Sequence, residues 1–142
     1  MKESQELLKH IYENAEMGNY TCKVLLEDLK DKDNKIKGLL TEIQDDYQKF
    51  QDKVGKRLTD EKPKKNLMSK MMANMGIKKE VKSDNSDSSM AEMLIQGLSM
   101  GSIEMEKKVK AYKESAKEED IKLAIEFLKF QENNIAKLKK YL

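Results

Sequence analysis

The sequence predicts an all-α protein, and three observations support this fold class. Charged residues make up 38% of the 142 residues and hydrophobic residues another 38%, a balance typical of amphipathic helices. Only one proline and six glycines interrupt the chain. Apolar residues also recur at spacings of three and four over four long stretches. The length suits one core, so we expect residues 1–142 to form a single domain.

The first two helices are predicted at about residues 4–29 and 34–58, separated by the charged run "KDKDN". The first has one apolar stripe, formed by Leu8, Ile11, Ala15, Gly18, Cys22, Leu25 and Leu29. The second has another, formed by Ile36, Leu40, Ile43, Tyr47, Phe50 and Val54. Cys22 is the only cysteine, so it cannot form an internal disulfide, and we expect it to be a core residue rather than a reactive thiol.

The last two helices are predicted at about residues 89–114 and 118–142. Ser89 and Glu92 have the spacing of a capping box, which places the start of the third helix at Ser89. Short connectors make the first and last pairs of helices antiparallel hairpins. The long crossover, residues 59–88, lets the third helix run parallel to the second.

The two predicted hairpins are similar in sequence. Met17-Gly18 aligns with Met100-Gly101, and Ile36-Lys37 aligns with Ile121-Lys122. This similarity predicts two copies of one hairpin around a pseudo-two-fold axis, although any two amphipathic helices align loosely. Gly97 and Gly101 form a small-xxx-small pair that favours close helix packing, with a homodimer face as the alternative.

Two segments, "MAEMLIQGLSMGSIEM" and "FLKFQENNIAKLKKYL", resemble a bacterial, clostridial-type branch of uncharacterised ferritin-like proteins. Two helical hairpins joined by a long crossover also resemble the ferritin-like superfamily, which includes the rubrerythrins. The resemblance implies a ferritin-like four-helix bundle.

The resemblance also implies a di-iron site built from one Glu on each of two helices and a Glu-x-x-His motif on each of the other two. Here Glu132 is followed three residues later by Ile135, and Glu42 by Asp45. We therefore expect no cofactor. The alternative is a divergent site for iron or manganese, for which the candidate ligands are Glu16, Glu104 and Glu132.

Glu132 has a second interpretation, because it falls on the apolar stripe of the last helix opposite Tyr47 in the repeat alignment. A buried carboxylate needs a hydrogen-bond donor, and the phenol of Tyr47 could supply one. The alternative is that Glu132 lies at the edge of the stripe and reaches water.

The crossover contains a methionine-rich segment, "NLMSKMMANMGIKKEV", for which we predict a short helix at about residues 67–77. Its apolar side consists of Leu67, Met68, Met71, Met72, Met75 and Ile77. We expect this side to pack on the bundle as a lid, because burial of a Met side chain is worth about 1.5–3 kcal/mol. The alternatives are a docking surface for a partner protein or an anionic membrane, and a Met-based copper(I) site.

Charge is unevenly distributed along the chain. Residues 62–82 contain seven lysines and one acid, Glu80, whereas the formal net charge of the whole chain is only +2. The segment has no aromatic residue to stack on bases and Arg57 is the only arginine of the chain, so we expect no nucleic-acid partner.

The sequence has no apolar run near the ~20 residues that a membrane-spanning helix needs, and its start lacks the apolar stretch of a signal peptide. We therefore expect a cytoplasmic protein. The interpretation that follows is a non-enzymatic ferritin-like bundle without metal, serving as an interaction or stress-associated structural module, with a homodimer or an unknown protein as partner. The alternative function is a carboxylate-bridged iron-binding protein.

Overall fold

The computed structural model describes residues 2–59 and 67–142. These residues form five helices and no strand, which confirms the all-α class. The helices are α1 (Lys2–Asp28), α2 (Lys37–Arg57), α3 (Leu67–Ser83), α4 (Asp87–Tyr112) and α5 (Glu118–Lys139). The crossover predicted at residues 59–88 lies partly outside the described residues. Of the described helices, none combines the length and the apolar character needed to cross a membrane.

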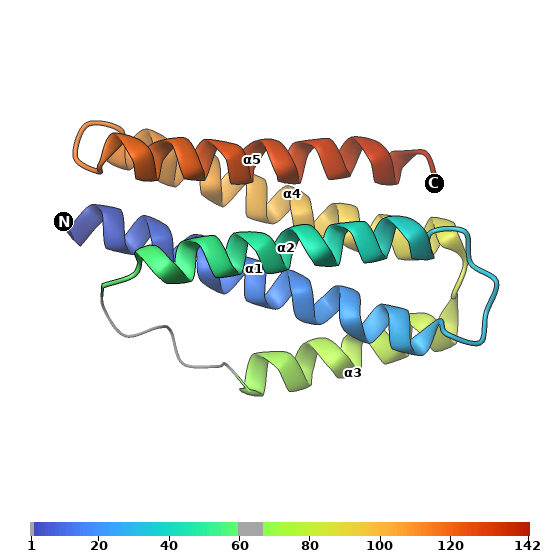
Figure 1. Cartoon of the computed structure of the whole chain (residues 1–142). Helices are drawn as coiled ribbons and strands as arrows, with labels where there is room; N and C mark the ends of the chain where they lie inside the picture. The colour runs from blue at the N-terminus through green and yellow to red at the C-terminus, as the bar shows by residue number, and fades with distance from the viewer. Residues whose placement is uncertain (1, 60–66) are drawn as a thin grey trace.

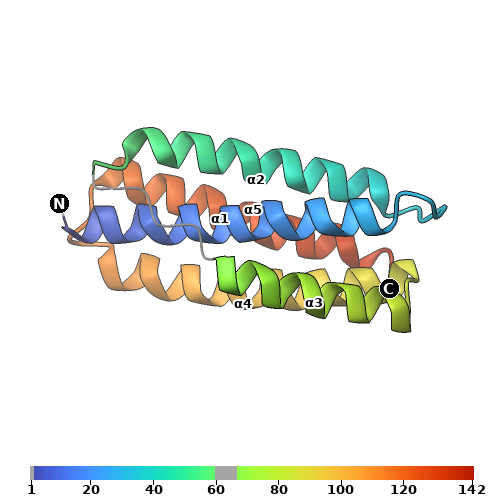
Figure 2. The ribbon, with the colours of Figure 1, turned by 90° about the horizontal axis from the view of Figure 1, so that it is seen from below.

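The helices form two close pairs and one outlying helix. α1 packs along α2, and α4 packs along α5, in each case with the two helices running in opposite directions (Figure 1). α2 and α4 run in the same direction. α3 lies on the outer side of α1 and runs parallel to it, as both views show (Figures 1 and 2). One side of α3 therefore faces α1, and the opposite side faces away from the other helices.

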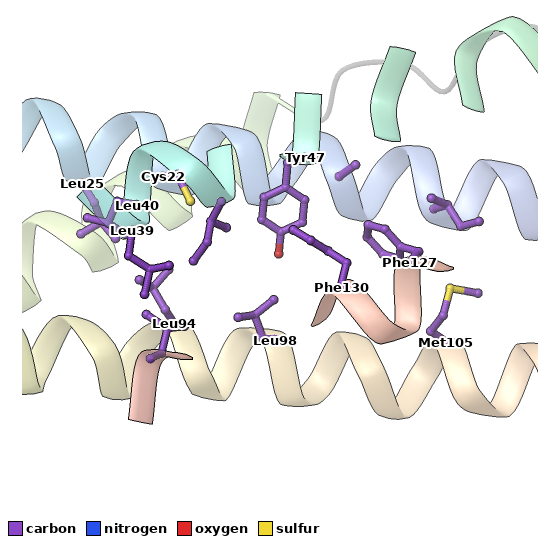
Figure 3. Packing of buried hydrophobic residues seen from close by; sticks show 14 of the residues in the cluster. Cys22, Leu25, Leu39, Leu40, Tyr47, Leu94, Leu98, Met105, Phe127 and Phe130 are labelled. Atoms are coloured by element: carbon purple, nitrogen blue, oxygen red, sulfur yellow. The ribbon is translucent and has the colours of Figure 1, made fainter. Parts of the chain in front are cut away.

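The core lies between the four long helices and has aromatic rings near its centre. Figure 3 shows Tyr47 of α2 beside Phe127 and Phe130 of α5, with Leu98 and Met105 of α4 close by. The ring centroids of Tyr47 and Phe130 are 4.9 Å apart in an edge-to-face arrangement, and those of Phe50 and Phe127 are 5.0 Å apart. Such pairs add about 0.5–1.5 kcal/mol beyond the burial of their surface. This cluster joins the α1–α2 pair to the α4–α5 pair.

Polar contacts connect the two pairs at one end of the molecule. The carboxylate of Asp87, in the first turn of α4, accepts hydrogen bonds from the Asn34 side chain at 2.9 Å and from the backbone N–H of Lys35 at 3.2 Å. The backbone N–H of Ile36 also donates to it, at 3.4 Å. These donors belong to the connector before α2, which begins at Lys37 and not at about Asn34 as predicted.

The other end has a second set of contacts. The Nε of Arg57, at the end of α2, lies 2.7 Å from a carboxylate oxygen of Asp120, which is 2% exposed. The same guanidinium contacts Glu119 at 2.8 Å. The backbone N–H of Lys117 donates to the hydroxyl of Ser4 at 2.7 Å, which ties the connector before α5 to the start of α1.

Two further helix boundaries differ from those predicted. α4 begins at Asp87, and its N-cap is Ser86, whose hydroxyl accepts a hydrogen bond from the backbone N–H of Ser89 at 3.1 Å. The Ser89–Glu92 pair therefore lies inside the helix. α3 continues beyond Ile77 to Ser83, because both Ile77 and Val81 are buried and the helical turn between them gives α3 a contact with the core.

Candidate functional site

The side of α3 that faces away from the bundle is covered with methionines. Met68, Met71, Met72 and Met75 are each between 65% and 74% exposed. The prediction that these side chains pack on the bundle is therefore wrong. Positions three and four apart share one helical face, so the four side chains form a continuous ridge, which we call the methionine ridge.

α3 contacts the rest of the molecule through its opposite side. Ile77 and Val81 are 4% and 9% exposed and belong to the core cluster. These two residues, and not the methionines, are the apolar side chains that α3 buries against the core. The prediction places Ile77 on the same side as the methionines, but Ile77 is nine residues after Met68 and therefore lies on the opposite side of the helix.

Two ion pairs fasten α3 to α1. The Nζ of Lys70 lies 3.4 Å from a carboxylate oxygen of Glu16, and both side chains are 16% exposed. The same Nζ lies 5.5 Å from the centroid of the Tyr20 ring. The Nζ of Lys78 donates to the carboxylate of Asp28 at 3.1 Å. These contacts hold α3 along α1, so the methionine ridge has a fixed direction.

The exposed side of α3 also carries positive charge. Lys79 and Lys82 follow Met75 at spacings of four and seven, which places all three on one helical face, and both lysines are exposed. Glu80 is the only acid between residues 67 and 83, and its position puts it on a different side of the helix from Met75. The outward side of α3 is thus apolar in its first half and basic in its second half. The spacing of Met75, Lys79 and Lys82 is the sequence signal that identifies this combined face.

A cleft of about 710 Å³ lies beside α3, with walls from α1, α2 and α4 and a contribution from Ser69. Apolar side chains such as Leu98 contribute to its lining, as does Tyr47. Three acids, Glu13, Glu16 and Glu104, also line it. The cleft thus combines apolar and acidic side chains.

The metal candidates do not form one site. Glu16 and Glu104 both line the cleft, but Glu132 is exposed on α5 and does not line it. Glu16 is paired with Lys70, which reduces its tendency to bind a cation. Over residues 2–59 and 67–142, no group of three or more His, Cys, Asp or Glu side chains could hold a metal ion. The described residues therefore do not fit the di-iron centre that the resemblance implies.

The proposed contact between Tyr47 and Glu132 is wrong. Tyr47 is 6% exposed, whereas Glu132 is exposed to solvent. The buried positions on this part of α5 are Phe127, Phe130, Gln131 and Asn134, whereas Glu132 lies outside the inward face. Gln131 takes the inward position and is fully buried.

Two further side chains with titratable groups, His10 and Cys22, are partly or fully buried. His10 is half-buried, and the burial together with the nearby positive charge of Lys108 lowers its pKa, against an opposing effect of Glu104. Burial raises the pKa of the Cys22 thiol to about 12, so this side chain is a neutral thiol at neutral pH. The expectation that Cys22 is a core residue is confirmed.

Comparisons with protein-family models, with curated proteins and with solved structures found no match for this chain.

Proposed function

We propose that this chain is a non-enzymatic helical bundle of the ferritin-like type that acts as an interaction module through the outward side of α3. The single observation that carries this proposal is the exposure of the methionine ridge. The pairing of α1 with α2 and of α4 with α5, and the parallel course of α2 and α4, support the ferritin-like part of the proposal.

The methionine ridge supports a binding function on energetic grounds. Burial of a Met side chain is worth about 1.5–3 kcal/mol, and four adjacent exposed methionines forgo that gain in the isolated chain. Exposed apolar patches of this kind mark interaction sites, and the flexible thioether of Met adapts to irregular surfaces. α3 is also fixed through Ile77, Val81 and its two ion pairs. A partner would therefore meet a preformed surface, with little entropy lost on binding.

We propose a function without metal because of where the candidate carboxylates lie. The alternative, an iron or manganese protein, needs Glu16, Glu104 and Glu132 to approach one another, but Glu132 is exposed outside the cleft that the other two line. Elemental analysis of the chain purified without chelators tests this part. Stoichiometric iron or manganese that is lost on Glu132→Gln would overturn it. The proposal also includes a cytoplasmic location and a stress-associated role.

Photo-crosslinking inside cells that naturally make the chain tests the binding function. A photoreactive amino acid replaces Met71 on the ridge or, as the matched control, the exposed Lys129 on α5. We expect a discrete crosslinked product from position 71 and none from position 129. Equal crosslinking from both positions, or none from position 71, would contradict a role for the ridge in binding.

A further inference from the structure

We infer that the surface recognised by the methionine ridge is an anionic lipid membrane, to which α3 binds with its axis in the plane of the interface. This inference rests on the proposed function and adds the identity of the partner. It depends on three features of the described residues: the distribution of charge, the arrangement of the outward face of α3, and the attachment of α3 to α1.

The charge distribution gives the molecule a preferred orientation. α3 holds four lysines and one acid, and since the whole chain has a net charge of only +2, the remainder of the chain is net negative. Near an anionic surface, α3 is attracted and the net charge of the remainder is repelled. The orientation with the lowest electrostatic energy therefore places α3 against the membrane.

The outward face of α3 has the chemistry of an interfacial helix. The methionine ridge occupies its first half, and Lys79 and Lys82 extend the same face in its second half. In an interfacial helix, apolar side chains enter the boundary between headgroups and acyl chains, while lysine ammonium groups remain at the level of the phosphates. No acid lies on this face among residues 67–83, because Glu80 lies on a different side of the helix.

The way in which α3 is attached makes this face available as a whole. Figure 2 shows α3 at the edge of the molecule, alongside α1. Its contacts with the core, through Ile77 and Val81, and the ion pair of Lys70 with Glu16 lie on the side opposite the methionines. Lys78, which pairs with Asp28, lies at the edge of the ridge beside Met71. The ridge can therefore enter a lipid interface while Ile77, Val81 and Lys70 keep their contacts with the rest of the molecule.

The same charges disfavour a second copy of the chain as the occupant. Two α3 helices packed in parallel through their outward faces would bring the Lys79 and Lys82 side chains of both copies together, and like charges in a partly desolvated interface repel one another. Packed antiparallel, the same helices would set the lysines of each copy against the methionines of the other, where the ammonium groups have no partner of opposite charge. An anionic surface instead supplies the opposite charge to both lysines.

Sedimentation of the full chain with lipid vesicles tests the inference. The probes are vesicles of phosphatidylcholine mixed with phosphatidylglycerol and vesicles of pure phosphatidylcholine. We expect binding to the mixed vesicles and at least about tenfold weaker binding to the neutral ones, with a loss of binding as the salt concentration rises through the range in which surface charges are screened.

Two pairs of variants separate the roles of the methionines and the lysines. The double variant Met71→Ser with Met75→Ser should lose vesicle binding, whereas Met100→Ser, at a methionine of α4 that is 67% exposed, should keep it. Lys79→Gln with Lys82→Gln should weaken binding to the mixed vesicles about tenfold or more. The charge-matched control, Lys129→Gln with Lys139→Gln on α5, should bind like the parent. All substituted side chains are exposed, so folding is expected to be retained, and circular dichroism checks it.

The outcomes distinguish failure of the inference from failure of the proposed function. Absence of binding to the mixed vesicles, or equal loss in the ridge and control variants, overturns the lipid partner. If position 71 nevertheless gives a crosslinked product in cells, its mass shows whether the partner is another protein or a second copy, and the binding function stands. If both experiments are negative, the ridge is not a binding surface.

Discussion

Gly18 of α1 lies directly against the ring of Tyr47 of α2, so that a Cβ added at Gly18 would be 2.2 Å from the Cζ of the ring. Gly101 of α4, which aligns with Gly18 in the internal repeat, lies in the same way against Gln131 of α5, whose Nε2 would be 2.6 Å from an added Cβ. In both helix pairs, a glycine on the earlier helix makes room for a large side chain of the later helix. The similarity between the hairpins therefore extends to how each one packs.

Gly18→Ala should destabilise the protein. The added methyl group would overlap the ring of Tyr47, a rigid and buried side chain, and overpacking of this kind costs about 1–3 kcal/mol. Gly97→Ala is the matched control, because nothing lies within 4 Å of an added Cβ there. The control should gain about 0.5–1 kcal/mol from the higher helix propensity of Ala. Urea denaturation measures both free energies of unfolding, and equal effects would contradict the close contact.

Gln131→Met should stabilise the protein. Gln131 is fully buried, and neither its Nε2 nor its Oε1 has a hydrogen-bond partner among the described residues. A buried amide without partners costs about 1–3 kcal/mol, and Met has a similar length without the polar atoms. Chemical denaturation of the variant measures the gain. A loss of stability would show instead that ordered water satisfies the amide, with the neighbouring Asn14 as a candidate partner for that water.

Arg57→Gln should destabilise the protein by about 1–3 kcal/mol, because it leaves the buried carboxylate of Asp120 without its cationic partner. Lys53→Gln is the control. Lys53 pairs with Glu126 at 3.4 Å, but both side chains are well exposed, and such pairs contribute only about 0–1 kcal/mol. Thermal or chemical unfolding of the two variants gives the comparison, and an equal cost would contradict the importance of burial at Asp120.

The effect of Arg57→Gln should also depend on pH. The hydrogen bond from Arg57 lowers the pKa of Glu119 below its ordinary value of 4.5. A carboxyl whose pKa is lower in the folded state stabilises the fold above the unfolded pKa, and this contribution disappears as the pH falls through the folded pKa. The contribution of Glu119 to the difference between parent and variant should therefore shrink below about pH 4.5. A difference that grows on acidification would contradict this assignment.

Cys22 should resist alkylation in the folded protein. The thiolate is the reactive form, and burial raises the pKa of this thiol to about 12. In urea the same residue should react at the rate of an ordinary cysteine. An exposed cysteine introduced by Ser88→Cys in a Cys22→Ala background is the control for reagent activity. Rapid labelling of Cys22 without denaturant would contradict its place in the core.

The long helices could be predicted from the sequence because each has an apolar stripe of helical period. The stripe of α1 lies at the predicted positions, with Ile11, Ala15 and Leu25 all fully buried. On α5 the sequence places Glu132 on the apolar stripe, whereas the buried positions are Gln131 and Asn134, because a hydrophobic pattern does not indicate buried polar side chains. The burial of Gln131 beside Gly101 and the contacts of Asp87 depend on neighbours far apart in the sequence, and no local pattern indicates them.

The direction of the methionine ridge could not be predicted for a related reason. A methionine-rich helix has an apolar side in any environment, and hydrophobicity favours packing of that side on the bundle. Which side of α3 meets α1 depends on Ile77, Val81 and the partners of Lys70 and Lys78. These partners, Glu16 and Asp28, belong to a helix about fifty residues earlier in the chain.

Oxidation of individual methionines by hydrogen peroxide, followed by mass spectrometry, tests most directly the claim that the outward side of α3 is the binding surface. In the free chain, the four ridge methionines and Met100 should oxidise rapidly, while the fully buried Met90 and Met105 should oxidise slowly. With anionic vesicles present, the ridge methionines should become protected and Met100 should stay reactive. Slow oxidation of the ridge in the free chain, or equal protection of the ridge and Met100 on vesicles, would contradict the account.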